Sequence, residues 1–166
     1  MFNVGDLIIY STHGLCKIDE ISEKTFGDVT KLYYIMHPVT DANLTISIPV
    51  DSEQAVMLSI LEKEDAKRLL QSFEEPGIEW IEDIKKRTKK YKSLIDKGDR
   101  KVISQVLNTL MRKEIEAKVK NIRMSDQDRK LLTYLQNIMF EELAASLDTS
   151  YEDISNKVTD IISQKV

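Results

Sequence analysis

The amino-acid sequence predicts an α+β fold, in which a small, strongly bent sheet or barrel precedes a compact bundle of helices. Apolar and polar residues alternate from Leu44 to Val50, as in a strand with one buried face. Beyond Pro76-Gly77 the apolar residues recur with the period of a helix that buries one stripe. We therefore expect a β domain over 1–60, a short helix and linker over 61–77, and a helical domain over 78–166.

Short runs of β-prone residues account for the expected sheet. The runs are Leu7–Tyr10, Leu15–Ile21, Leu32–Met36 and Leu44–Val50. Turn residues separate them at Gly14, at Gly27-Asp28 and between Pro38 and Asn43. Such closely spaced short strands are typical of a strongly bent sheet or a small barrel.

The helical part begins with a short helix over Glu62–Phe73, followed by the linker Glu74–Gly77. A helix is then expected from about 79 to 97. Its apolar stripe consists of Trp80, Ile84, Tyr91, Leu94 and Ile95. Gly98 suits the left-handed position that ends a helix, and Asp99 suits the N-cap of the next. Ser125 and Thr149 are the expected N-caps of two further helices.

The net charge of −4 hides a strong asymmetry along the chain. Residues 1–80 carry 6 Lys and Arg against 14 Asp and Glu, whereas residues 81–123 carry 14 against 6. Residues 124–166 carry 4 against 8. A local basic stripe is the electrostatic feature that matters for nucleic acid, so an overall pI near 5.3 does not argue against it.

The basic stripe lies on the helix expected at 79–97. Its residues are Lys85, Lys86, Arg87, Lys89, Lys90 and Lys92, and Arg100 and Lys101 continue it. Helical spacing points most of this charge away from the apolar stripe. Like charges at this spacing destabilise an isolated helix by a few tenths of a kcal/mol, and a polyanion would relieve that cost by counterion release. From the residues alone, a solvated helix face is an equally good interpretation.

The residue inventory argues against an enzyme, and no cofactor or small-molecule substrate is expected. Neither His13 nor His37 has metal-ligand neighbours at the usual spacing, and no Gly-rich phosphate loop occurs. The single cysteine, Cys16, excludes an internal disulfide and fits the cytoplasm. No apolar run is long enough for a bilayer, and no secretory signal is visible, so no membrane partner is expected.

The opening of the chain resembles that of the CarD/CdnL family of bacterial transcription regulators. The resemblance rests on Phe2-Asn3-Val4-Gly5-Asp6, followed by Tyr10 and by His13-Gly14. It extends to a Trp-bearing helix, to Gly98-Asp99 and to helices through about residue 147. It implies a Tudor-like N-terminal barrel that docks on the β subunit of RNA polymerase, and C-terminal helices that meet promoter DNA.

The resemblance also implies roles for individual residues. Lys24, Phe26 and Ser47, on the second and fourth strands, match the positions that dock on the polymerase. Trp80 matches a residue that wedges into the minor groove at the edge of the melted promoter. By its spacing alone, a tryptophan in phase with Ile84 and Tyr91 is more often a core residue than a ligand-binding one. Arg129, near the start of a later helix, completes the expected DNA contacts.

The leading hypothesis is therefore a transcription regulator that docks on RNA polymerase and modulates the stability of the promoter open complex. DNA binding would be weak and largely independent of sequence, because no helix carries base-reading residues at recognition spacing. A polymerase- or protein-binding adaptor without DNA contact is the alternative. A hydrolase with an unrecognised site is a third and remote one.

Overall fold

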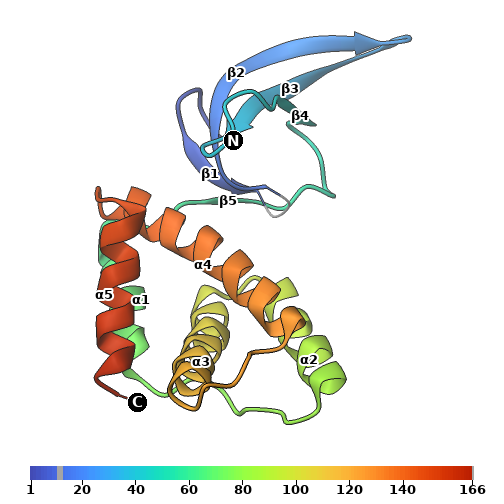
Figure 1. The fold of residues 1–166 in the computed structure, drawn as a ribbon. Coiled ribbons are helices and arrows are strands. Elements are labelled where there is room, and N and C mark those ends of the chain that lie inside the picture. Colours follow the sequence, from blue (N-terminus) through green and yellow to red (C-terminus); the bar gives the residue numbers. More distant parts are fainter. Residues whose placement is uncertain (11–12, 166) are drawn as a thin grey trace. The chain divides into compact units, whose positions relative to one another are not determined.

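The computed structural model describes residues 1–10 and 13–165 and divides the chain into two compact units, Met1–Ile60 and Leu61–Val166. The first unit holds the strands and the second the helices, so the predicted α+β class is confirmed (Figure 1).

The first unit is a five-stranded antiparallel sheet with the order β4-β3-β2-β1-β5. The strands are β1 (Leu7–Tyr10), β2 (Gly14–Phe26), β3 (Val29–Pro38), β4 (Ile46–Pro49) and β5 (Met57–Ser59). The edge strands β4 and β5 do not pair with each other, so within the described residues the sheet is open and the expected closure into a barrel is wrong. The strong bend is present: the register of β2 against β3 shifts between Ile18 and Glu20, and such an irregularity bends a strand.

One face of the sheet covers a small apolar core. Its buried residues are Ile8, Cys16, Ile18, Tyr34, Met36 and Ile48. The opening motif closes one end of this core. Phe2 meets the Tyr34 ring edge-on at 5.9 Å, and the Phe2 backbone N–H donates to the Tyr34 hydroxyl at 3.0 Å. Asp6 accepts from the Asn3 backbone N–H at 2.8 Å, and Gly5 supplies the positive φ that this turn needs.

The second unit is built from α1 (Lys63–Gln71), a 3-10 turn η1 (Ser72–Glu74), α2 (Ile84–Asp96), α3 (Arg100–Val119), α4 (Asp126–Ser146) and α5 (Tyr151–Ser163). Their apolar stripes share one core, which includes Phe73, Tyr91, Leu110, Leu132 and Ile154. Asp99 and Ser125 are the N-caps of α3 and α4, and Gly98 has a positive φ, as predicted. The cap of α5 is Ser150 and not Thr149, whose hydroxyl bonds Asp153 instead.

The helix expected at about 79 begins later, at Ile84, because Asp83 caps it by accepting the Lys86 backbone N–H at 2.9 Å. The residues before it form an irregular segment, Glu75–Glu82, which we call the strap. Buried side chains hold the strap by its backbone. Asn108 donates to the Glu75 carbonyl at 2.8 Å, and the Thr109 hydroxyl both accepts from and donates to the backbone of Ile78.

The strap passes so close to α3 that only glycine fits at one position. A Cβ on Gly77 would lie 2.0 Å from the Thr109 Oγ1 and 3.0 Å from backbone atoms of α3. The sequence pattern suggests a linker here, but the structure shows a segment fastened along its length to the helical unit.

A buried ion pair fastens α2 and the strap to α4. The Arg87 guanidinium donates from Nε and Nη2 to the two carboxylate oxygens of Asp128, at 3.0 and 2.5 Å. Its Nη1 donates to the strap carbonyls of Ile81 and Glu82, at 2.6 and 3.2 Å. Asp128 also accepts from the Ser125 hydroxyl at 2.7 Å. Arg87 is 3% and Asp128 4% exposed, so each charge depends on the other for compensation.

We expect Asp128→Asn to destabilise the helical unit by about 3 kcal/mol, because it leaves the Arg87 charge buried without its counter-charge. Urea unfolding followed through the emission of Trp80, the sole tryptophan, would measure this. Asp126→Asn is the matched control. It lies two residues away in the first turn of α4 and forms an exposed pair with Arg123, so its cost should stay below about 1 kcal/mol. Equal losses in the two variants would contradict the role given to the buried pair.

Candidate functional site

The three residues expected to dock on the polymerase lie on one face of the sheet. Strand pairing places Lys24 opposite Lys31 and Phe26 opposite Val29, and it places Ser47 opposite Ile35. These side chains point away from the core side of Tyr34, Met36 and Ile48. We call this surface the outer face.

Contacts on the outer face join the three residues. The Lys24 ammonium donates to the Ser47 hydroxyl at 3.0 Å, across the intervening strand β3. It also lies 5.9 Å from the centre of the Tyr33 ring, and the Phe26 ring meets the same tyrosine edge-on at 5.8 Å. Tyr33, which the sequence did not single out, is therefore the centre of the cluster.

The tip of the β2–β3 hairpin carries exposed apolar side chains. Phe26 is 64% and Val29 55% exposed, and the two are directly paired across the turn at Gly27. Two large apolar side chains at an otherwise polar tip form a small patch that a protein partner could cover. Figure 1 shows β2 and β3 as the longest strands of the sheet, ending in this turn.

The basic stripe predicted on α2 lies mostly on its exposed side. Lys85, Lys86, Lys89, Lys90 and Lys92 are all exposed, on the side opposite the buried Tyr91. We call this surface the lysine face. Among residues 1–10 and 13–165, none of the five forms an ion pair. Their charges are thus available to a polyanion.

The arginines expected beside these lysines are placed differently. Arg87 is buried and engaged by Asp128, so it is not on the lysine face. Arg100, at the start of α3, is a quarter exposed and binds the buried Glu142 through Nε and Nη2, at 2.8 and 2.7 Å. Lys101 is exposed at the start of α3. Arg129 is exposed on α4, away from the side of that helix that faces α2.

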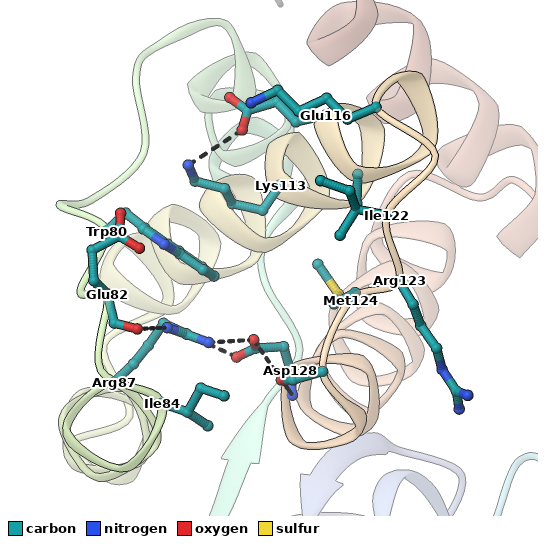
Figure 2. Close-up of a pocket in the computed structure, with 13 residues that line it drawn as sticks. Trp80, Glu82, Ile84, Arg87, Lys113, Glu116, Ile122, Arg123, Met124 and Asp128 are labelled. Atoms are coloured by element: carbon teal, nitrogen blue, oxygen red, sulfur yellow. Dashed lines mark hydrogen bonds and ion pairs between the residues drawn. The ribbon is translucent and has the colours of Figure 1, made fainter.

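Trp80 lies in the strap, four residues before α2 begins, and not in the first turn of that helix. Its indole is partly buried against the helical core. The Arg87 guanidinium lies 3.9 Å from the ring centre and the Lys113 ammonium 5.0 Å from it. Figure 2 shows these two cations on either side of the indole. The ring is therefore held by cation–π contacts in this structure.

A surface hollow of about 470 Å³ opens beside Trp80. Ile84, Ile122 and Met124 supply apolar lining, and the Arg87–Asp128 pair lies at its wall (Figure 2). Lys113, Lys120 and Arg123 contribute cations, Glu82 and Glu116 contribute acids, and Lys113 forms an ion pair with Glu116. The mixed charge makes this hollow less suited to a polyanion than the lysine face.

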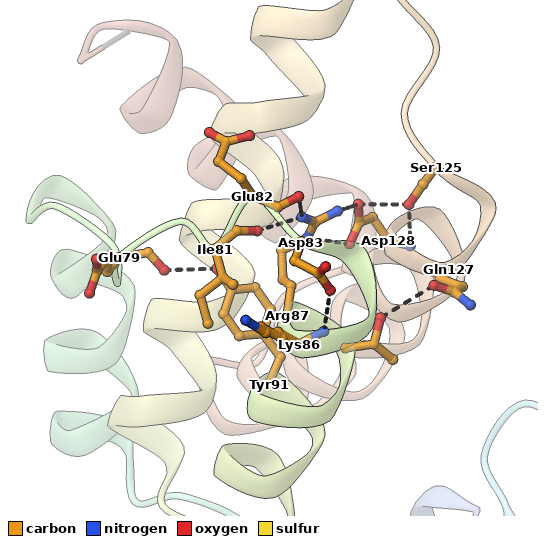
Figure 3. Close-up of polar contacts among 11 residues, drawn as sticks. Glu79, Ile81, Glu82, Asp83, Lys86, Arg87, Tyr91, Ser125, Gln127 and Asp128 are labelled. Carbon is orange, nitrogen blue, oxygen red and sulfur yellow. Dashed lines mark hydrogen bonds and ion pairs between the residues drawn. The ribbon is translucent and has the colours of Figure 1, made fainter.

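Tyr91 bonds the strap beside the ion pair (Figure 3). Its hydroxyl donates to the Glu79 carbonyl at 3.0 Å. Burial raises the pKa of Tyr91 to about 12, against the opposing effect of the Arg87 charge. The hydroxyl therefore keeps its proton, and its bond to the strap, throughout the physiological pH range.

Sequence reasoning missed a cation on α4. Lys130 shares a groove with Lys92 of α2, whereas Arg129, the residue of α4 that was expected to contact DNA, does not line it. The spacing of residues along α4 could have pointed to Lys130, because one stripe of this helix, at i, i+3, i+4 and i+7, consists of Gln127, Lys130, Leu131 and Tyr134. Knowing which stripe faces α2 requires the tertiary structure.

Membrane spans and metal clusters are both absent from the described part of the chain. None of its helices is long and apolar enough to cross a membrane. Its histidine, cysteine and acidic side chains form no group of three or more that could hold a metal ion.

Both units match known protein families. Residues 2–60 match the family model described as CarD-like/TRCF RID domain, and residues 68–159 match that of the CarD C-terminal domain. The chain is 26% identical over 148 residues to YdeB of Bacillus subtilis (strain 168), which is named as a candidate transcription factor; the match covers 86% of this chain and 90% of YdeB. Transcription regulation, and not catalysis, is the type of function of this family. The chain belongs to the CarD family of transcription regulators.

Proposed function

We propose that this transcription regulator docks on the β subunit of RNA polymerase through the outer face and contacts promoter DNA through the lysine face. In this way it modulates the stability of the open complex. The lysine face is the observation that carries the DNA part of the proposal: five exposed lysines on one helix surface, with no ion-pair partner in residues 1–10 and 13–165.

CarD-like domains interact with RNA polymerase, and the first unit matches such a domain over nearly its whole length. The outer face offers what a protein interface needs. Phe26 is an exposed aromatic anchor, and Lys24 is held in place by Ser47 and Tyr33. The open edge of β4 adds backbone groups that a partner strand could pair with.

The arrangement of α2 supports contact with the phosphate backbone. Its buried side is fixed by Tyr91 and by the Arg87–Asp128 pair, so the lysines project from a rigid helix. Lysine acts as a mobile point charge and carries little base specificity. The polymerase would then bring the protein to promoters. The contact of the outer face with polymerase and that of the lysine face with DNA, each weak alone, would strengthen each other by raising the effective concentration.

Trp80 can act as a wedge at the edge of the bubble only if its indole leaves Arg87 and Lys113. Unpaired and kinked DNA would have to supply stacking that replaces these cation–π contacts. We propose this exchange as the step that distinguishes melted from intact DNA, since intact duplex offers no unstacked base.

The packing of Trp80 and the engagement of Arg87 and Arg100 by acids also favour a second candidate function. In that case the protein is an adaptor that binds the polymerase or another protein and makes no DNA contact. Its lysine face would then meet an acidic protein surface or only solvent.

The outer face can be tested by the double variant Lys24→Glu, Phe26→Ala. We expect loss of co-elution with RNA polymerase and with an isolated β-lobe fragment, since removing a central aromatic anchor costs about 2 kcal/mol or more at an interface. The control is Thr25→Ala, Thr30→Ala, which alters the other face of the same hairpin, where the two hydroxyls bond at 2.8 Å. Retained binding by the first variant would exclude the outer face as the docking surface.

The lysine face can be tested by the triple variant Lys85→Ala, Lys86→Ala, Lys89→Ala. We expect weaker binding to a fork-junction promoter fragment and a salt dependence whose slope falls by about 0.9 for each phosphate that the variant no longer neutralises. The control is Lys63→Ala, Lys67→Ala, Lys157→Ala, which removes three exposed lysines of α1 and α5. An unchanged salt slope together with normal polymerase binding would favour the adaptor.

The wedge can be followed through Trp80 itself, because it is the sole tryptophan. Its emission should change when the protein binds a fork-junction fragment and stay unchanged with intact duplex of the same sequence, because only the fork offers an unstacked base. Trp80→Phe should keep the salt slope of binding but remove the preference for the fork. If Trp80→Phe still prefers the fork, residues other than Trp80 recognise the melted DNA.

A further inference from the structure

Exposed apolar side chains of the helical unit gather at the hollow beside Trp80. Among residues 61–165, the large aliphatic side chains that remain exposed are Ile84, Val119 and Ile122. Ile84 and Ile122 line the hollow, and Val119 ends α3, whose last turn also lines it. Val119 is 80% and Ile122 62% exposed. Large apolar side chains that cluster on a protein surface mark a site of interaction.

The turn that follows α3 fixes the position of Ile122 but does not bury its side chain. Asn121 has a positive φ of 53°, and the Ile122 backbone N–H donates to the Ala117 carbonyl at 2.8 Å. At helix ends of this kind, the residue after the turn often packs on the last turn of the helix. Here the residue to pack on is Ala117, and an alanine is too small to cover an isoleucine. The local structure therefore accounts for the place of Ile122 but not for its exposure.

Most of the charges that line the hollow are already paired within the protein. Arg87 binds Asp128, and the Lys113 ammonium lies 3.3 Å from a carboxylate oxygen of Glu116. The Arg123 guanidinium lies 3.1 Å from an acid of α4. A polyanion gains little from cations that acids have neutralised, so the charges argue against DNA as the occupant of the hollow.

Two lining charges of opposite sign are left over. Lys120 and Glu82 are exposed, and neither forms an ion pair in the described part of the chain. Figure 2 shows Glu82 on the same side of the hollow as Trp80, with Ile122 across from them. An apolar lining with one available cation and one available acid is complementary to a protein surface that presents an apolar side chain between charges of opposite sign.

We propose that the hollow binds an apolar side chain of RNA polymerase, with Lys120 meeting an acid beside that side chain. This inference rests on the proposed function, because docking through the outer face brings the helical unit to the polymerase. It adds a second protein contact, which the helical unit makes and in which no residue of the lysine face takes part. Two contacts with one partner strengthen each other by raising the effective concentration.

The contact also acts on Trp80, whose ring forms part of the wall of the hollow. A polymerase side chain that lies against this ring holds it between Arg87 and Lys113. Melted DNA has to displace that side chain before the indole can leave. The polymerase contact in the hollow and the wedge therefore compete for Trp80.

Photocrosslinking with the full-length protein tests the contact. The photoreactive amino acid p-benzoylphenylalanine would replace Ile122, and the protein would be irradiated with RNA polymerase in the absence of DNA. We expect a covalent product with a polymerase subunit. The control is the same replacement at Asn156, which is exposed on α5 and should give no product. No product from position 122, in a sample where the protein co-elutes with polymerase, would overturn the proposal.

The affinity for polymerase, measured without DNA, gives a second test. Val119→Ser, Ile122→Ser should weaken binding by about fivefold or more at unchanged thermal stability, because both side chains are exposed. Lys120→Glu should also weaken binding, because it places an acid opposite the acid of the partner. The matched control is Lys118→Glu, which changes the net charge equally but at an exposed residue that does not line the hollow. Equal losses in the two charge variants would show that only net charge matters and would exclude the hollow.

The outcomes separate this contact from the proposed function. If Lys24→Glu, Phe26→Ala abolishes polymerase binding while the variants at 119, 120 and 122 bind normally, the second contact fails and the proposed function stands. If the wild-type protein does not bind polymerase, both fail. If the photoproduct in a complex of polymerase and promoter forms with DNA instead of protein, the hollow is a DNA-binding surface and the proposal is overturned.

Discussion

The buried pair of Arg87 and Asp128 is the interaction on which the helical unit depends. One guanidinium binds a carboxylate of α4 through two nitrogens and the strap carbonyls of Ile81 and Glu82 through the third. Its remaining surface lies against the Trp80 ring. A planar group with donors in several directions can serve these partners together, which the point charge of a lysine could not do. Arg87 therefore contributes at once to the position of α2, to the end of the strap that precedes this helix, and to the place of Trp80.

This constraint also shapes the surface that would meet DNA. Because Arg87 and Tyr91 hold one side of α2 in the core, the lysines of the same helix are directed outward. Acids of α4 engage both arginines of the basic region, Arg87 and Arg100, while the lysines of α2 have no ion-pair partner among residues 1–10 and 13–165. Arginine thus supports the scaffold, and lysine supplies the available charge. This division agrees with a contact that reads the backbone more than the bases.

In the sheet unit, the geometry of the strands determines which side chains form the outer face. The irregularity in β2 bends the strand, and beyond it β2 and β3 continue as a long hairpin to the turn at Gly27. Strand alternation then places Lys24, Phe26 and Tyr33 on the face opposite the core. Each unit therefore carries its own candidate interface on a rigid element, and a regulator can combine two weak contacts without either being tight.

Local signals in the sequence determined the fold class, most of the strands, and the caps at Gly98, Asp99 and Ser125. These features depend on residues close together in the chain, so periodicity and capping chemistry reveal them. They also located the lysines of α2. Only the tertiary structure decided that the sheet stays open, that Trp80 lies in a strap, and that Arg87 is buried. The partner of Arg87 is 41 residues away, and helical spacing carries no information about which charge on another helix will neutralise it. For the same reason, the sequence could not show that Lys130 faces α2. Which stripe of α4 faces α2 is decided by the packing of the two helices and not by the sequence of either helix alone.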